Sequence, residues 1–112
     1  MTAAEELRTA ARLVRETASK ATEGHPAPWH IEPEFNGWWL VGTPAPHLVT
    51  SAARKPVADW IALMGPDKAE PLADALDDHA DAHSAYDCTW PEDECPHVRL
   101  ARSITGTTGD PS

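Results

Sequence analysis

The sequence predicts an α+β fold, in which an N-terminal helix and a tryptophan-rich β-hairpin or three-stranded meander precede three short helices. Apolar residues recur at helical spacing near both ends of the chain, and strand-forming residues flank Asn36-Gly37. Eleven prolines in 112 residues keep every element short. The length fits a single domain, which we place at residues 1–106, with a disordered tail at 107–112.

The first helix is expected over residues 2–22. Thr2 can cap its first turn, and Glu5 completes a capping box. Its apolar stripe is rich in alanine, so a neighbouring helix can approach closely. The stripe consists of Leu7, Ala10, Ala11, Val14, Ala18 and Ala21. Gly24 and Pro26 end the helix.

A hairpin is expected over residues 29–42, because Asn36-Gly37 favours a tight two-residue turn. This turn would pair Phe35 with Trp38. One face then holds Trp29, Ile31, Phe35, Trp38 and Leu40, and the other holds His30, Glu32, Glu34, Trp39 and Val41.

Trp39 follows from this arrangement as a candidate partner-binding residue, because only one face of a single-layer hairpin can pack on the helices. The alternative is that residues 43–50 fold over it. Residues 47–50 can add a third strand.

Three helices are expected in the second half of the chain. The first begins at Pro56 and runs to about Met64. Its buried side is predicted to be Val57, Trp60, Ile61 and Met64. The second covers about 67–86, with an inner stripe of Ala69, Leu72, Ala73, Leu76, Ala80 and His83. The last covers about 95–105, with His97, Leu100, Ala101 and Ile104 facing inward.

The net charge of −9 disfavours direct binding to nucleic acids and to anionic membranes. The excess of acid lies in residues 67–94, and part of it forms one row on the helix over 67–86. The row contains Asp74, Asp77, Asp78 and Asp81. It is a candidate surface for a protein partner with a basic surface, and the alternative is a solvated face that keeps the protein soluble. We find no membrane span and no signal peptide, so a cytoplasmic location is expected.

A group of metal-ligating residue types lies between the last two predicted helices. The expected ligands are His83, Cys88, Cys95 and His97, with His79 as the alternative, and they would hold one structural zinc ion. The alternative is two free thiols and helix histidines without a metal.

No catalytic residue is assigned from the sequence. A metalloprotease helix needs Glu directly after its first histidine, and Ala80 occupies that position after His79. A small hydrolase that uses the Cys/His group is the least favoured alternative.

Two segments resemble those of a known group of proteins. Residues 20–29 read KATEGHPAPW and precede the hairpin, and residues 57–66 read VADWIALMGP and precede the acidic helix. They resemble the K-A-T-P-G-P-W and I-A-x-x-x-P segments of the Ead-like early proteins of lambdoid phages and their uncharacterised actinobacterial counterparts, although the first segment carries an insertion. The resemblance covers roughly residues 8–80 and transfers no catalytic residue. It implies a non-enzymatic phage or prophage accessory protein that acts on regulation. The function favoured for the whole chain is a small interaction protein that binds a protein partner or forms a homo-oligomer, and a zinc-stabilised binding domain is the alternative.

Overall fold

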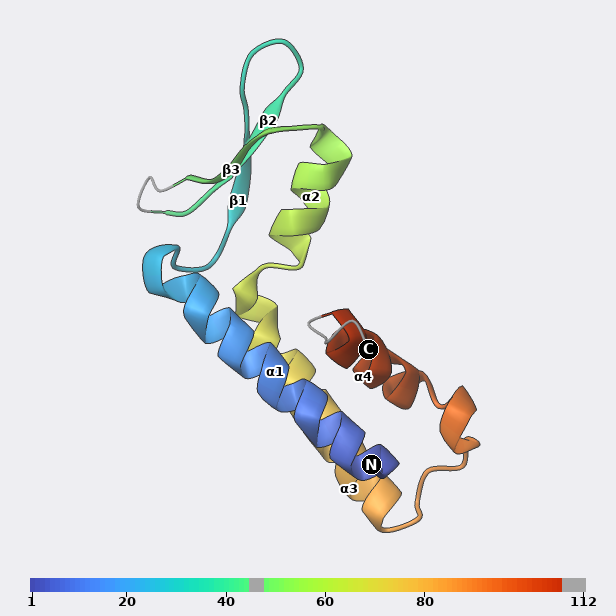
Figure 1. The fold of residues 1–112 in the computed structure, drawn as a ribbon. Helices are drawn as coiled ribbons and strands as arrows, with labels where there is room; N and C mark the ends of the chain where they lie inside the picture. Colours follow the sequence, from blue (N-terminus) through green and yellow to red (C-terminus); the bar gives the residue numbers. More distant parts are fainter. Residues whose placement is uncertain (45–47, 108–112) are drawn as a thin grey trace. The chain divides into compact units, whose positions relative to one another are not determined.

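The computed structural model describes residues 1–44 and 48–107, and these residues have an α+β fold (Figure 1). The helices are α1 (Ala3–Gly24), α2 (Lys55–Leu63), α3 (Ala69–Ser84) and α4 (Pro96–Thr107), with the short 3₁₀ helices η1 (Pro66–Lys68) and η2 (Glu92–Glu94). The strands are β1 (His30–Pro33), β2 (Trp39–Gly42) and β3 (Leu48–Ala53), which form one antiparallel sheet in the order β1-β2-β3. The predicted disordered tail falls outside the described residues from residue 108 onward. Among the described helices, none has the length and apolar character to cross a membrane.

The chain divides into two compact units. The helical unit contains Met1–Glu16 and Glu70–Ser112, and the sheet unit contains Thr17–Ala69. The helical unit therefore holds the first part of α1, nearly all of α3, and α4. The sheet unit holds the three strands and α2.

The helical unit has a core made largely of alanine. The Thr2 cap predicted at the start of α1 is present, since the Glu5 amide donates to the Thr2 hydroxyl over 3.1 Å, and this hydroxyl donates to the Glu5 carboxylate over 3.2 Å. The buried core residues are Ala3, Ala4, Leu7, Ala10, Ala11, Ala73, Leu76, Ala80, Cys95, Val98 and Ala101. The first part of the alanine stripe of α1 thus packs against the inner stripe of α3, and α4 completes the core.

One predicted inner position of α4 is wrong. Leu100 is 41% exposed, whereas Val98 is fully buried. The helix begins directly after Cys95, and the side of α4 that faces the core is the side that carries Val98 and Ala101, three residues apart.

The sheet unit contains the predicted Asn36-Gly37 turn, but the register is shifted by one residue. Asn36 and Gly37 both have positive φ angles, of 59° and 79°. The Glu34 amide, rather than that of Phe35, donates to the Trp38 carbonyl over 2.8 Å. Phe35 is therefore an extra residue in the loop, and the strands pair from Pro33 opposite Trp39 onward.

The shift changes which side chains share a face. Ile31 lies opposite Val41 and not on the face of Leu40, so the predicted division of the hairpin faces is wrong. Val41 is fully buried, and Trp39 lies two residues away on the same side. The Lys55 ammonium, at the start of α2, stands 5.4 Å from the centre of a Trp39 ring. This face of the sheet is the one that meets α2, which contacts β1 and β2.

The burial predicted for α2 is wrong for three of its four residues, and the fourth, Ile61, is half-buried. Its fully buried residue is Ala58. Val57 and Met64 are each 51% exposed, and Trp60 is 62% exposed. The small Ala58 side chain lets α2 lie close to the sheet, and that contact turns the large apolar side chains outward.

Candidate metal centre

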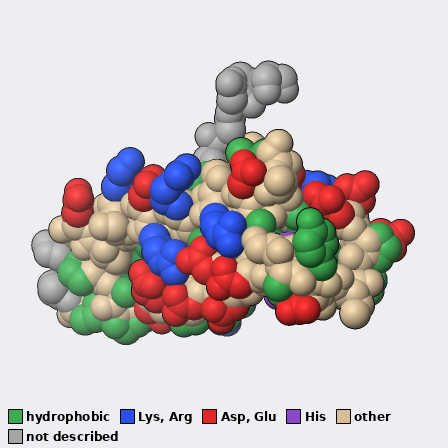
Figure 2. Space-filling view, turned by 90° about the horizontal axis from the view of Figure 1, so that it is seen from below, with side chains coloured by type: hydrophobic (Ala, Val, Ile, Leu, Met, Phe, Trp, Pro, Cys, Tyr) green, Lys and Arg blue, Asp and Glu red, His purple; other side chains and the backbone are tan. Residues whose placement is uncertain are grey.

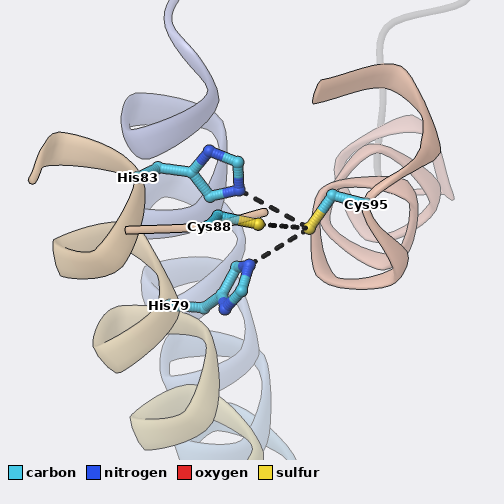
Figure 3. Close-up of side chains that lie close together, drawn as sticks. All are labelled: His79, His83, Cys88 and Cys95. Carbon is cyan, nitrogen blue, oxygen red and sulfur yellow. Dashed lines mark hydrogen bonds between the residues drawn. The ribbon is translucent and has the colours of Figure 1, made fainter. Parts of the chain in front are cut away.

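Four side chains of the helical unit converge at the end of α3 (Figure 3). They are His79, His83, Cys88 and Cys95, and their ligand atoms all lie within 4.8 Å of one another. His79 Nε2 is 3.1 Å from Cys95 Sγ, and His83 Nε2 is 3.5 Å from the same sulfur. Cys88 Sγ is 3.9 Å from Cys95 Sγ.

Helical spacing places the two histidines. His79 and His83 are four residues apart on α3, so their rings project from the same face of the helix. The ring centroids are 4.9 Å apart in an edge-on arrangement.

A turn with a strained residue places Cys88. After α3 the chain reverses through Tyr86, which has a φ of 59°, and the Asp87 amide donates back to the Ala82 carbonyl over 2.8 Å. This pattern is a Schellman turn with a non-glycine residue in its left-handed position. It directs the following residue, Cys88, toward the side of α3 that bears the histidines.

The start of α4 places Cys95. Its amide donates to the Pro91 carbonyl, and its carbonyl accepts the hydrogen bond of the Arg99 amide, both over 2.9 Å. Pro96 follows at the first helical position, where its fixed φ favours the helix. The backbone of Cys95 is therefore held on both sides, and its thiol is fully buried.

The three distances to the Cys95 sulfur fit the edges of a tetrahedral zinc site. Zinc–sulfur bonds of about 2.3 Å and zinc–nitrogen bonds of about 2.0 Å give tetrahedral edges of about 3.8 Å between sulfurs and about 3.5 Å between sulfur and nitrogen. The observed separations of 3.9 Å, 3.1 Å and 3.5 Å lie close to these values. Two thiol sulfurs and two imidazole nitrogens are also a ligand set that zinc prefers. The group can therefore hold a metal ion.

The electrostatics of His79 favour the form that a metal needs. Burial lowers the pKa of His79 below its usual value, and repulsion from His97 and His83 lowers it further. A lowered pKa keeps the imidazole neutral, with a lone pair available for a metal.

The structure brings together three of the four ligands named first from the sequence, and His79 joins them in place of His97. The His97 ring stacks on the His79 ring, with centroids 3.9 Å apart and planes 14° apart. The i, i+4 spacing of His79 and His83 is the sequence feature that places both rings on one face of α3.

The acidic row has partners within the helical unit. Arg15 of α1 forms ion pairs with Glu70 at 3.3 Å, Asp74 at 2.8 Å and Asp77 at 2.7 Å. Arg8 forms an ion pair with Asp81 at 3.1 Å. Figure 2 shows Lys and Arg side chains lying directly beside groups of Asp and Glu on one face.

Three of the four acids predicted to bind a partner therefore form ion pairs within the chain itself. Asp74, Asp77 and Asp81 join α3 to α1, while Asp78 is exposed. The hydrogen bond from Arg15 to Asp77, and then that to Glu70, raises the pKa of Arg15 above its usual value. Because later residues of α1 pair with earlier residues of α3, the two helices run antiparallel. The row thus relieves its own repulsion by pairing with arginines.

Comparison with known proteins identifies no relative. No protein-family model matches the chain, and neither a curated protein nor a solved structure is significantly similar to it.

Proposed function

We propose that this chain is a non-enzymatic binding protein whose helical unit is closed by one structural zinc ion. The convergence of His79, His83, Cys88 and Cys95 carries the proposal. Four protein ligands fill the coordination of a structural zinc site, whereas a catalytic site keeps a position open for water or substrate. The fully buried Cys95 sulfur, with three other ligand atoms around it, also argues against a nucleophile that must reach a substrate.

The zinc ion would join segments that the core holds only weakly. Its ligands come from α3, from the loop after it and from the start of α4, so a single ion connects all three. A small domain with few large core residues gains most from such a connection.

Metal content and chelation test this proposal. Purified, untagged protein should contain about one zinc per chain by plasma mass spectrometry, as expected for one four-ligand site. A chelator should lower the melting temperature, and added zinc should restore it. Protein that contains no zinc, gains none in zinc-supplemented buffer and melts equally with chelator would refute the structural zinc.

A separate observation in the sheet unit supports protein binding. Val57, Trp60, Leu63 and Met64 form an apolar surface on and just after α2, and Trp60 and Leu63 are 62% and 60% exposed. Val41 and Ala58 are the fully buried apolar residues of this unit within the part of the chain that the structure describes. A surface of this kind is typical of an interface.

We propose that a second copy of the chain covers this α2 surface. The four side chains expose about 450 Å² per copy, so a symmetric pair would bury at most about 900 Å², close to the apolar share of a standard interface. The sheet unit has five acidic and four basic residues, so two copies meet here without strong repulsion, whereas most of the net charge of −9 lies in the helical unit.

Light scattering over a range of concentrations tests this pairing. Wild-type protein should become dimeric as concentration rises, and Trp60→Glu should stay monomeric because it buries a charge at the centre of the contact. Phe35→Glu is the matched control, since Phe35 is 78% exposed in the hairpin loop and should leave the dimer intact. A monomeric wild type throughout the range, or equal loss of pairing in both variants, would contradict the proposed dimer. The resemblance to phage accessory proteins stays a prediction, and a non-enzymatic dimer is compatible with it.

A further inference from the structure

The two thiols of the candidate metal centre lie next to each other but differ in exposure. Cys88 Sγ and Cys95 Sγ are 3.9 Å apart. Cys88 is half-buried, whereas Cys95 is fully buried. A small oxidant therefore reaches the Cys88 sulfur first and finds the second sulfur directly behind it.

We propose that Cys88 and Cys95 are an oxidation site, at which a hydroperoxide converts the two thiolates to an intramolecular disulfide and thereby releases the metal. The metal release rests on the proposed zinc site. The formation of the disulfide rests only on the placement of the two sulfurs.

The reaction takes place in two steps when the hydroperoxide is hydrogen peroxide. The Cys88 thiolate attacks one peroxide oxygen, an S–O bond forms, the O–O bond breaks, and a sulfenic acid and hydroxide result. The Cys95 thiolate then attacks the Cys88 sulfur, an S–S bond forms, and a second hydroxide leaves. The two sulfurs lose two electrons, the peroxide gains them, and each hydroxide takes up a proton to become water.

The local backbone permits the second step. The sulfurs must approach by about 2 Å to form a bond. Cys95 is fixed at the start of α4, whereas Cys88 lies in the loop between α3 and η2, outside regular secondary structure. The Cys88 side therefore supplies the movement, and the buried sulfur acts as the resolving thiol.

Oxidation removes two of the four metal ligands at once. The remaining His79 and His83 imidazoles offer two neutral nitrogens, too few for the four-coordinate site that zinc prefers in proteins. The new disulfide still joins the loop after α3 to the start of α4. The helical unit thus exchanges a metal link for a covalent link, and we expect it to lose zinc without unfolding.

Peroxide treatment of the zinc-loaded protein tests the inference. Intact mass should fall by the mass of two hydrogen atoms relative to the reduced apoprotein, and two thiols should be lost for each zinc ion detected by a chromogenic zinc dye. Far-ultraviolet circular dichroism should remain helical. Dithiothreitol should restore both thiols, and added zinc should then bind again.

Single cysteine variants test the order of the two steps. In Cys95→Ser, dimedone should trap a sulfenic acid on Cys88, whereas in Cys88→Ser it should label the buried Cys95 at least tenfold more slowly. Peptide mapping of oxidised wild-type protein should show the Cys88–Cys95 link, which keeps the test decisive if either variant folds poorly.

Three outcomes would overturn the inference. They are thiols that survive peroxide in the folded protein, disulfides that join two chains, and oxidation of one sulfur to the sulfinic acid without a disulfide. Protein that binds no zinc yet forms the intramolecular disulfide would contradict the structural zinc while supporting the oxidation site. Zinc-loaded protein that forms no disulfide would support the structural zinc while contradicting the oxidation site.

Discussion

Replacement of His79 by Gln should abolish tight zinc binding, whereas His97→Gln should not. His79 Nε2 stands 3.1 Å from the Cys95 sulfur and is one of four converging ligand atoms. His97 contacts the site through ring stacking on His79. Loss of a direct ligand should exceed the roughly 10- to 100-fold effect of losing a neighbour that orients one. We therefore expect at least a 100-fold loss of affinity for His79→Gln and less than about 10-fold for His97→Gln.

The difference in zinc affinity between the two variants also determines how far zinc stabilises each of them. Zinc present at 1,000 times its dissociation constant stabilises the fold by about 4.1 kcal/mol, and a 100-fold weaker site loses about 2.7 kcal/mol of that. Competition with a chromogenic chelator gives the affinity, and urea unfolding with and without zinc gives the stability. If His97→Gln loses zinc while His79→Gln keeps it, the ligand set read from this structure is wrong, and the set first expected from the sequence is right.

Three further predictions concern the helical unit. Leu76→Ala should lower the free energy of unfolding by about 2–5 kcal/mol because Leu76 is 1% exposed, whereas Leu100→Ala should cost less than about 1 kcal/mol; urea unfolding measures both. The metal-free protein should lose stability as the pH falls below about 6.5, because burial lowers the pKa of His79 in the folded state and the unfolded chain therefore takes up the proton first. The urea midpoint should fall as the pH is lowered from 8 to 5, and His79→Gln should weaken this dependence on pH. Tyr86→Gly should raise the free energy of unfolding by roughly 0.5–1 kcal/mol because Tyr86 is 94% exposed with a φ of 59°, while Tyr86→Ala should bring no gain; urea unfolding of both variants measures this difference.

The sequence predicts those parts of the fold that depend on local spacing. The Thr2 cap follows from the residue type at the helix start, and the inner stripe of α3 follows from helical periodicity. The Asn36-Gly37 turn follows from the ability of these residues to adopt positive φ. The hairpin register does not follow, because a single extra loop residue, Phe35, moves every later pair. The side of α2 that is buried cannot be predicted from local spacing either. Periodicity identifies an apolar side but cannot tell whether this chain or another molecule covers it.

The candidate site shows the same limit. Residue types and spacing indicate a Cys/His group, and Cys88, Cys95 and His83 follow directly from them. The choice between His79 and His97 depends on the side from which α4 faces α3, which is a tertiary property. The charge pattern of the sequence also predicts the acidic row but not the arginines that pair with it, since Arg8 and Arg15 lie more than fifty residues along the chain from these acids.

The composition of the core explains why the helical unit needs links beyond hydrophobic burial. Seven of its eleven buried core residues are alanines, and Leu7, Leu76 and Val98 are its large aliphatic side chains. A buried leucine or valine contributes roughly 1.5–3 kcal/mol, and alanine contributes far less because it has little apolar area. Alanine instead allows α1 and α3 to approach closely, which brings the Arg8 and Arg15 side chains within reach of the acidic row. The buried contact of α4 consists of Val98, Ala101 and Cys95 with the partly buried Ile104, and Arg102 adds an ion pair with Glu6 of α1 at 2.6 Å. A link at Cys95, whether through zinc or through a disulfide to Cys88, strengthens a contact in which Val98 is the one fully buried large aliphatic side chain of α4.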